Sequence, residues 1–366
     1  MPLSAVDTIS LAFHHTKRQL IQPFRFWQWT RLAFVGLLAG EMGSGGSFNF
    51  PSNFHLPPQG GSSRHLLPAG FPHVDPALLG GLIAVAIITG FVFIIVMTYI
   101  SSVMRFILFD SILAKECHIR EGWSRRQGPG WKYFLWHLGF LAVTLMCAIV
   151  LFGIPAAIGF AAGWFQSPHE HLLPLILGGV MLFFVFIVFV IATAVVQVLT
   201  KDFVVPQMAL EGIGAIEGWR RLWAMMQAEK GGYAVYVGMK IVLAMGAGII
   251  IGIASIILTL MFAVPVVGVV VAAIFAGKTT GLTWNVFTIT AAVVAGCILF
   301  AIFFYVISLI SVPVIVFFPA YSIYFFAARY RPLSVALYPP PVPAVTPPYG
   351  VPPQEPPPLP PTPLPA

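Results

Sequence analysis

Apolar residues run through this chain in long uncharged stretches, and the charged residues are gathered between them. A helix needs about 20 apolar residues to cross the ~30 Å hydrocarbon core of a bilayer. Five uncharged stretches are at least that long, and they occupy residues 76–104, 133–169, 172–200, 241–277 and 279–328. We therefore predict an all-α polytopic bundle, with transmembrane helices near residues 77–102, 134–162, 174–199, 234–262 and 286–311.

A sixth span is predicted at Phe24–Gly40, although this segment carries two arginines. The distribution of basic residues argues for it. Of the 19 Lys and Arg residues, all except Arg64 and Lys278 fall on one side if Phe24–Gly40 crosses the membrane. An excess of Lys and Arg in alternate loops marks the cytoplasmic side. The prediction is thus a transmembrane domain at 24–330 with about six spans and both termini cytoplasmic.

Composition agrees with this class of protein. Hydrophobic residues make up 58% of the chain, charged residues only 8%, and the mean hydropathy is +0.92. A soluble domain carries roughly a quarter charged residues. The lipid bilayer is therefore the expected partner, and the net charge of +7 is explained by the cytoplasmic loops rather than by nucleic-acid binding. Three cysteines suggest no disulfide framework.

The N-terminal segment, residues 1–23, is predicted to be an amphipathic helix on the cytoplasmic leaflet. Ser4 and Asp7 match the spacing of a capping box at its start. A soluble leader helix is the alternative. Four apolar residues recur on one face of the predicted helix: Val6, Ile9, Phe13 and Leu20.

Two further segments have no apolar periodicity. The predicted outer loop at 41–76 is rich in Gly, Ser and Pro, and the segment 331–366 is predicted to be a disordered, proline-rich cytoplasmic tail. From Pro339 the tail contains PxxP spacings that favour polyproline II. It is either a docking ligand for a cytoplasmic protein or an unpartnered solvated tail.

A motif occurs twice, each time in a charged segment between two apolar stretches. Both copies contain Glu-Gly-Trp with an arginine two residues after the tryptophan, and we expect each to form a short amphipathic elbow helix at the cytoplasmic surface. Gly128-Pro129-Gly130 is expected to end the first elbow and Gly231-Gly232 the second. An even number of spans separates the copies, which predicts a parallel internal repeat. The motif residues are Glu121, Gly122, Trp123 and Arg125 in the first copy and Glu217, Gly218, Trp219 and Arg221 in the second.

The second copy carries a resemblance. The stretch from Phe203 to Gly212, FVVPQMALEG, followed by EGWRR at Glu217–Arg221, resembles a repeat of uncharacterised bacterial multi-pass membrane proteins. These are related to the membrane domain of glycerophosphoryl diester phosphodiesterases and to the YciC-like inner-membrane family. The resemblance covers roughly 75–330 and implies a multi-pass protein of the bacterial inner membrane. The soluble phosphodiesterase barrel is missing from this chain, so the resemblance does not carry over hydrolase activity.

No catalytic, cofactor-binding or metal-binding residue is predicted, and we do not expect an enzyme. His169 and His171 form an HxH pair that is too small for a zinc site by itself. We find no ionisable residue near the bilayer centre, because Lys240 lies close enough to the end of its span to reach the interface. The preferred hypothesis is a non-enzymatic membrane-organising or adaptor protein. The alternative is a permease or lipid-handling transporter with an uncharged pathway between the repeats. The oligomeric state stays open.

Overall fold

The computed structural model describes residues 4–22, 24–41, 76–165, 167, 169, 171–280 and 286–338. These residues form helices and no strand, which confirms the all-α prediction. In chain order the elements are α1 Asp7–Leu20, α2 Phe26–Leu38, α3 Pro76–Ala114, α4 Ile119–Ala148, η2 Ile149–Gly153, α5 Ile154–Ala161, α6 Leu172–Leu199, η3 Thr200–Val204, α7 Val205–Glu211, α8 Ala215–Ala228, α9 Lys230–Thr280, α10 Val286–Ala327 and α11 Arg331–Leu337.

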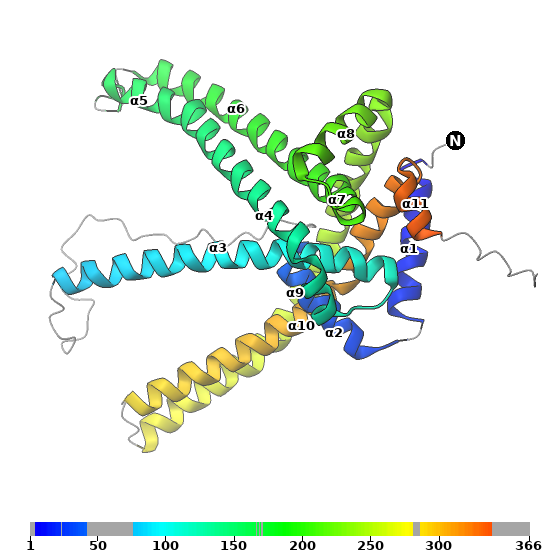
Figure 1. Ribbon diagram of the computed structural model, residues 1–366. Coiled ribbons are helices and arrows are strands. Elements are labelled where there is room, and N and C mark those ends of the chain that lie inside the picture. Colours follow the sequence, from blue (N-terminus) through cyan, green and yellow to red (C-terminus); the bar gives the residue numbers. More distant parts are fainter. Residues whose placement is uncertain are drawn as a thin grey trace, which may run out of the picture.

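Three apolar arms extend from one packed region, which we call the hub (Figure 1). The arms are the N-terminal part of α3, the hairpin of α4–α5 with α6, and the hairpin of α9 with α10. The hub contains α1, α2, α7, α8 and α11 together with the near ends of the long helices. Its interior is aromatic: Phe203, Tyr236, Tyr321, Phe325 and Phe326 are almost completely buried.

Five apolar stretches in the described residues are long enough to cross a membrane, as predicted, and they indicate an integral membrane protein. Almost none of the residues in their most apolar windows are buried by the rest of the protein. Apolar surface on this scale requires lipid or another apolar partner around the arms. The stretches are Gly80–Ala114, Ile119–Ala161, Leu172–Glu211, Lys230–Gly268 and Thr290–Ala327.

The predicted sixth span is not confirmed. The helix in this segment, α2, has 13 residues, about 20 Å at 1.5 Å per residue, which is shorter than the hydrocarbon core. It packs instead inside the hub, against α3 and α10. A Cβ atom added at Gly36 would lie 2.3 Å from Cγ2 of Ile315, so this helix crossing depends on glycine. The repeat, likewise, is not confirmed at the level of the whole fold.

The N-terminal helix begins as predicted but packs differently. The backbone N–H of Asp7 donates to Oγ of Ser4 over 3.2 Å, which is the capping interaction expected from the sequence. The face of α1 that packs into the hub, however, carries small and polar residues, and Val6 and Phe13 are 56% and 62% exposed. The buried residues of α1 are Thr8, Ala12, His15, Thr16, Gln19 and Leu20.

The C-terminal boundary needs a correction. The disordered tail was placed at 331–366, but Arg331–Leu337 forms α11, whose Leu333 is fully buried in the hub. Proline near the start of a helix is favourable because the first N–H groups need no partner there, which explains how this proline-containing segment folds. The rest of the tail, residues 339–366, and the outer loop between Glu41 and Pro76 lie outside the described residues.

Candidate functional site: a charged cluster at the base of the arms

Five ionisable side chains from separate parts of the chain meet where the arms join the hub. Two of them are consecutive, on the π-helical turn η3 at the end of α6. Wide turns of this kind recur at functional sites, because the extra residue re-aims the neighbouring side chains. We call the group the charged cluster, and it consists of Glu41, Arg105, Lys201, Asp202 and Lys240.

Two ion pairs hold the cluster together. Nζ of Lys201 pairs with Oε2 of Glu41, and Nζ of Lys240 pairs with Oδ2 of Asp202. The hydroxyl of Tyr236 also donates to Oδ2 of Asp202, over 2.9 Å. Glu41, Asp202 and Lys240 are only 2%, 2% and 6% exposed. Burying charges this deeply is unfavourable unless each has a partner, and these four have one.

Arg105 is the fifth charge, and no carboxylate of the described residues binds it directly. Its Nη1 donates to the hydroxyl of Tyr133 over 2.6 Å, and its Nη2 donates to the carbonyl of Ala39 over 2.8 Å. Its Nε is buried and has no hydrogen-bond partner among the described residues. Three basic and two acidic groups therefore leave one positive charge in excess and one donor unused.

At Glu41, the neighbouring positive charges affect the pKa of the carboxyl group more than burial does. Burial alone would raise the pKa of this carboxyl group, because an apolar environment disfavours its ionised form. The positive charges of Lys201 and Arg105 outweigh that effect, and the pKa of Glu41 is lowered from its ordinary value. The carboxylate is thus ionised at neutral pH.

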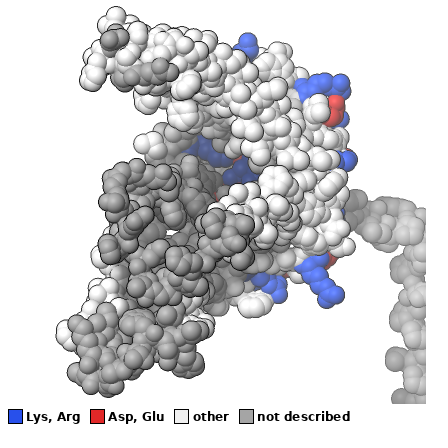
Figure 2. Space-filling model, turned by 90° about the vertical axis from the view of Figure 1, so that its left-hand side faces the viewer, with Lys and Arg blue, Asp and Glu red and all other residues white. Residues whose placement is uncertain are grey.

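The cluster lies at the level where the apolar surface of the arms ends. The exposed apolar residues of α3 continue to Met97, and Arg105 follows about 12 Å further along the helix. On α9, Lys240 directly precedes the exposed Ile241. Figure 2 looks from the arm tips into the hollow between the arms and shows basic side chains on its floor. Arg105 and Lys201 are the cluster's partly exposed cations.

A small cavity of about 30 Å³ adjoins the cluster and is lined by Glu41, Arg105, Lys201 and Asp202 among others. A cavity of this size holds about one water molecule. No group of three metal-ligating side chains occurs in the described part of the chain.

A family model matches residues 3–336, which is nearly all of the chain. Its description is a family of unknown function, DUF7544. The chain belongs to this family. No curated protein and no solved structure matches the chain at a significant level. The DUF7544 region includes the hub, the arms and every residue of the charged cluster, and it ends before the proline-rich part of the tail.

The two predicted elbows are locally alike at their glycines. A Cβ atom at Gly122 would lie 3.1 Å from Ile107 on α3, and one at Gly218 would lie 2.8 Å from Val204 on η3. Each elbow therefore approaches the helix that precedes it through its glycine. Trp123 and Trp219 are both half-buried at the edge of the hub. Trp219 also donates from Nε1 to the hydroxyl of Thr200 over 3.0 Å.

The elbows differ in two other respects. Arg221 pairs with Glu217 as predicted, whereas Glu121 and Arg125 are exposed and form no ion pair with each other. The second elbow is a separate helix, α8, but the first continues through Gly128-Pro129-Gly130 into its span as part of α4. The predicted end of the elbow at this tripeptide is wrong. Gly130 instead packs closely against α3, where an added Cβ atom would lie 2.6 Å from Cγ2 of Val103.

Other sequence candidates stay apart from the charged cluster. His169 and His171 lie in the turn between α5 and α6, far from the hub, and join no metal-ligating group in the residues described.

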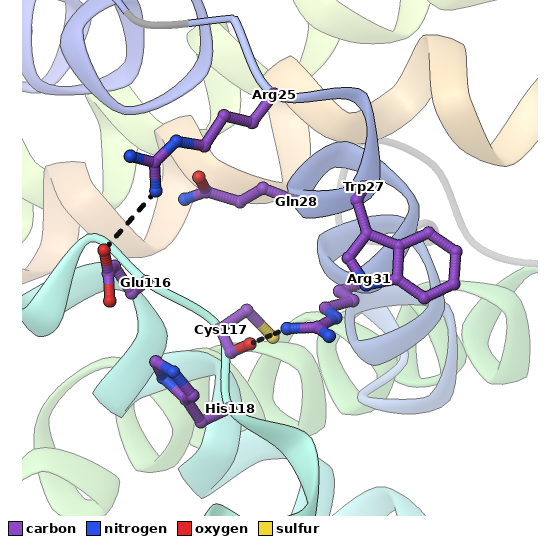
Figure 3. Close-up of a pocket in the computed structure, with 7 residues that line it drawn as sticks. All are labelled: Arg25, Trp27, Gln28, Arg31, Glu116, Cys117 and His118. Atoms are coloured by element: carbon purple, nitrogen blue, oxygen red, sulfur yellow. Dashed lines mark hydrogen bonds and ion pairs between the residues drawn. The ribbon is translucent and has the colours of Figure 1, made fainter.

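A pocket of about 170 Å³ lies where α2 begins beside the α3–α4 connection (Figure 3). Arg25 pairs with Glu116 at 3.5 Å, and Arg31 donates to the carbonyl of Cys117 over 3.2 Å. Burial raises the pKa of the Cys117 thiol, which makes it unreactive. These contacts attach α2 to the α3–α4 connection, so we assign this pocket a structural role.

The sequence analysis missed the charged cluster. It treated Lys240 as a residue that reaches the interface alone, and it found no intramembrane ionisable group. One signal was present: Arg105, the pair Lys201-Asp202 and Lys240 each border the end of an apolar stretch. Charges at such positions on several spans can meet only if the ends of those spans converge, and the periodicity of one helix does not report that.

Proposed function

We propose that this protein is a non-enzymatic, lipid-handling protein of the bacterial inner membrane. In this proposal the charged cluster receives the anionic headgroup of a bilayer lipid that lies between the arms. The observation that carries it is the position of the cluster: Arg105, a partly exposed cation whose guanidinium hydrogen bonds go to a hydroxyl and a carbonyl, lies at the base of apolar arms whose surfaces are not covered by protein.

The chemistry of the surroundings supports this proposal. Helix surfaces as apolar as those of the arms are solvated by lipid acyl chains wherever they are not packed on protein. A lipid between the arms would bring its headgroup to the level where the apolar surface ends, which is the level of the cluster. Arginine suits this role because its guanidinium group donates several hydrogen bonds to phosphate oxygens in fixed directions.

The adaptor hypothesis depends on the proline-rich residues 339–366, which lie outside the described part of the chain, and it stays a prediction. The resemblance to phosphodiesterase membrane domains and YciC-like proteins, the cytoplasmic position of both termini and the absence of enzymatic activity also stay predictions. The charged cluster supports the lipid-handling hypothesis, because it supplies a polar group at the base of the arms. The sequence alone predicts an uncharged pathway between the repeats.

The test is a thermal-stability measurement on the full-length protein in detergent, with added dioleoyl-phosphatidylglycerol or dioleoyl-phosphatidylcholine. A ligand that binds the folded state raises the melting temperature. We expect the anionic lipid to raise it several degrees more than the zwitterionic lipid. Arg105→Gln, which removes the excess charge, should reduce that difference by at least half.

Two controls make the result specific. The variant Arg120→Gln removes an exposed positive charge that lies outside the charged cluster, and it should respond like the wild type. Arg105→Lys keeps the positive charge, and it replaces Arg105→Gln in the experiment if that variant does not fold. An equal response to both lipids in every variant would rule out a headgroup site at the cluster.

A further inference from the structure

A second concave surface lies on the hub, and none of its lining residues belongs to the charged cluster. It is a groove of about 540 Å³ between the end of α6, α8 and the beginning of α9. Ligand pockets in proteins commonly fall in this size range. Most of its lining is apolar, and the apolar residues are Val195, Leu199, Trp223, Met226, Ala234 and Val237.

One end of the groove continues into the lipid-facing surface of the arms. Val195 on α6 follows the exposed Ile191 by one turn, and Val237 on α9 precedes the exposed Ile241 by one turn. An acyl chain between α6 and α9 could therefore extend from the bilayer into the groove without crossing a polar surface. This continuity indicates a lipid chain as the occupant, rather than a peptide or a soluble metabolite.

The other end of the groove is polar and positive. Lys230 is exposed, forms no hydrogen bond or ion pair with another described residue, and begins α9. The free N–H groups at a helix N-terminus attract anions. Gly231 leaves the backbone beside it open, because nothing lies within 4 Å of its Cβ position. Tyr233, only 3% exposed, lines the groove and has no hydrogen-bond partner for its hydroxyl among the residues described.

The nearest acidic group does not oppose an anion here. Glu229 precedes Lys230, but both of its carboxylate oxygens accept hydrogen bonds from Arg329, over 2.8 and 2.7 Å. Its charge is thus compensated within the hub. The charge of Lys230 is left to face the solvent at the head of the groove, whereas the carboxylate of Glu229 already lies against Gly232 in the first turn of α9.

We propose that this groove binds one glycerophospholipid, with an acyl chain between α6, α8 and α9 and its phosphate at Lys230. The site is distinct from the charged cluster and does not depend on it. Trp223, which is 57% exposed at the rim of the groove, would cover the acyl chain on the side of the lipid headgroups.

Native mass spectrometry of the full-length protein, with dioleoyl-phosphatidylglycerol, dioleoyl-phosphatidylcholine or oleate added, tests the site. We expect one tightly held phosphatidylglycerol that is retained in Arg105→Gln, so that a failure of the cluster site and a failure of the groove site are distinguishable. Ala234→Phe fills the groove and should abolish this retention. Val235→Phe, which places the same side chain on the next, exposed residue of α9, should leave it unchanged.

Lys230→Gln tests the headgroup contact separately and should fold, because Lys230 has no partner to lose. It should reduce the preference for phosphatidylglycerol over phosphatidylcholine about fivefold, the effect of one lysine beside an anionic lipid. Equal lipid retention by Ala234→Phe and Val235→Phe would overturn the proposal. Equally tight retention of oleate would overturn the assignment to a phospholipid.

Discussion

His15 on α1 is buried against α10, where its Nδ1 lies 3.0 Å from the hydroxyl of Tyr324 and the two rings make an edge contact at 5.6 Å. The sequence periodicity predicts one apolar face of α1 at Val6, Ile9, Phe13 and Leu20. In the structure Leu20 is buried and Ile9 packs against the hub, but Val6 and Phe13 are exposed. The reason is geometric: small residues such as Ala12 allow α1 to approach α10 closely. An apolar stripe predicts which face of a helix packs on protein only where lipid does not compete for the same apolar residues.

The burial of His15 predicts a pH-dependent stability. Burial, with a contribution from the charge of Lys115, lowers the pKa of this imidazole below its ordinary 6.5. The unfolded chain therefore binds a proton more readily, and stability falls as the pH drops below about 6.5. The slope contributed by one histidine is at most about 1.4 kcal/mol per pH unit.

Melting temperatures between pH 7.5 and 5.5 check this prediction against a matched pair of variants. His15→Gln should flatten the pH dependence. His14→Gln, at the exposed neighbouring position, should keep it. The same pH dependence in both variants would show that other groups cause it.

At the scale of helices, the long apolar spans could be predicted because membrane insertion depends on local composition. Their ends could not, because tertiary contacts decide them. Pro129 lies inside α4 because Gly130 packs against Val103. The charged cluster was missed for a similar reason: Asp202 and Lys240 lie on different helices, and their pairing requires knowledge of how α6 and α9 converge.

The crossing of α2 and α10 should be sensitive to a single methyl group. Gly36→Ala forces Ile315 to move and should destabilise the hub by about 1–3 kcal/mol. Gly139→Ala, on the exposed face of α4 where nothing lies within 4 Å, is the control and should be neutral or slightly stabilising. Chemical-denaturation or melting curves in detergent would measure both. Equal effects would show that α2 does not pack closely against α10.

At the scale of the whole molecule, the protein is a hub that carries three apolar arms, and both of its end helices, α1 and α11, pack on α10. This arrangement explains why composition identifies a membrane protein but not its function: lipid-facing residues dominate the sequence, whereas five charges define the candidate site. The sixth span stays a prediction: it depends on how the basic residues of α2 are assigned to the two sides of the membrane, and α2 packs inside the hub.

A structure of the protein in nanodiscs that contain phosphatidylglycerol tests the central claim most directly. We predict that lipid separates the arms and that a headgroup phosphate lies within hydrogen-bond distance of the Arg105 guanidinium group. Arms packed tightly on one another, with the charged cluster sealed from lipid by protein, would contradict it.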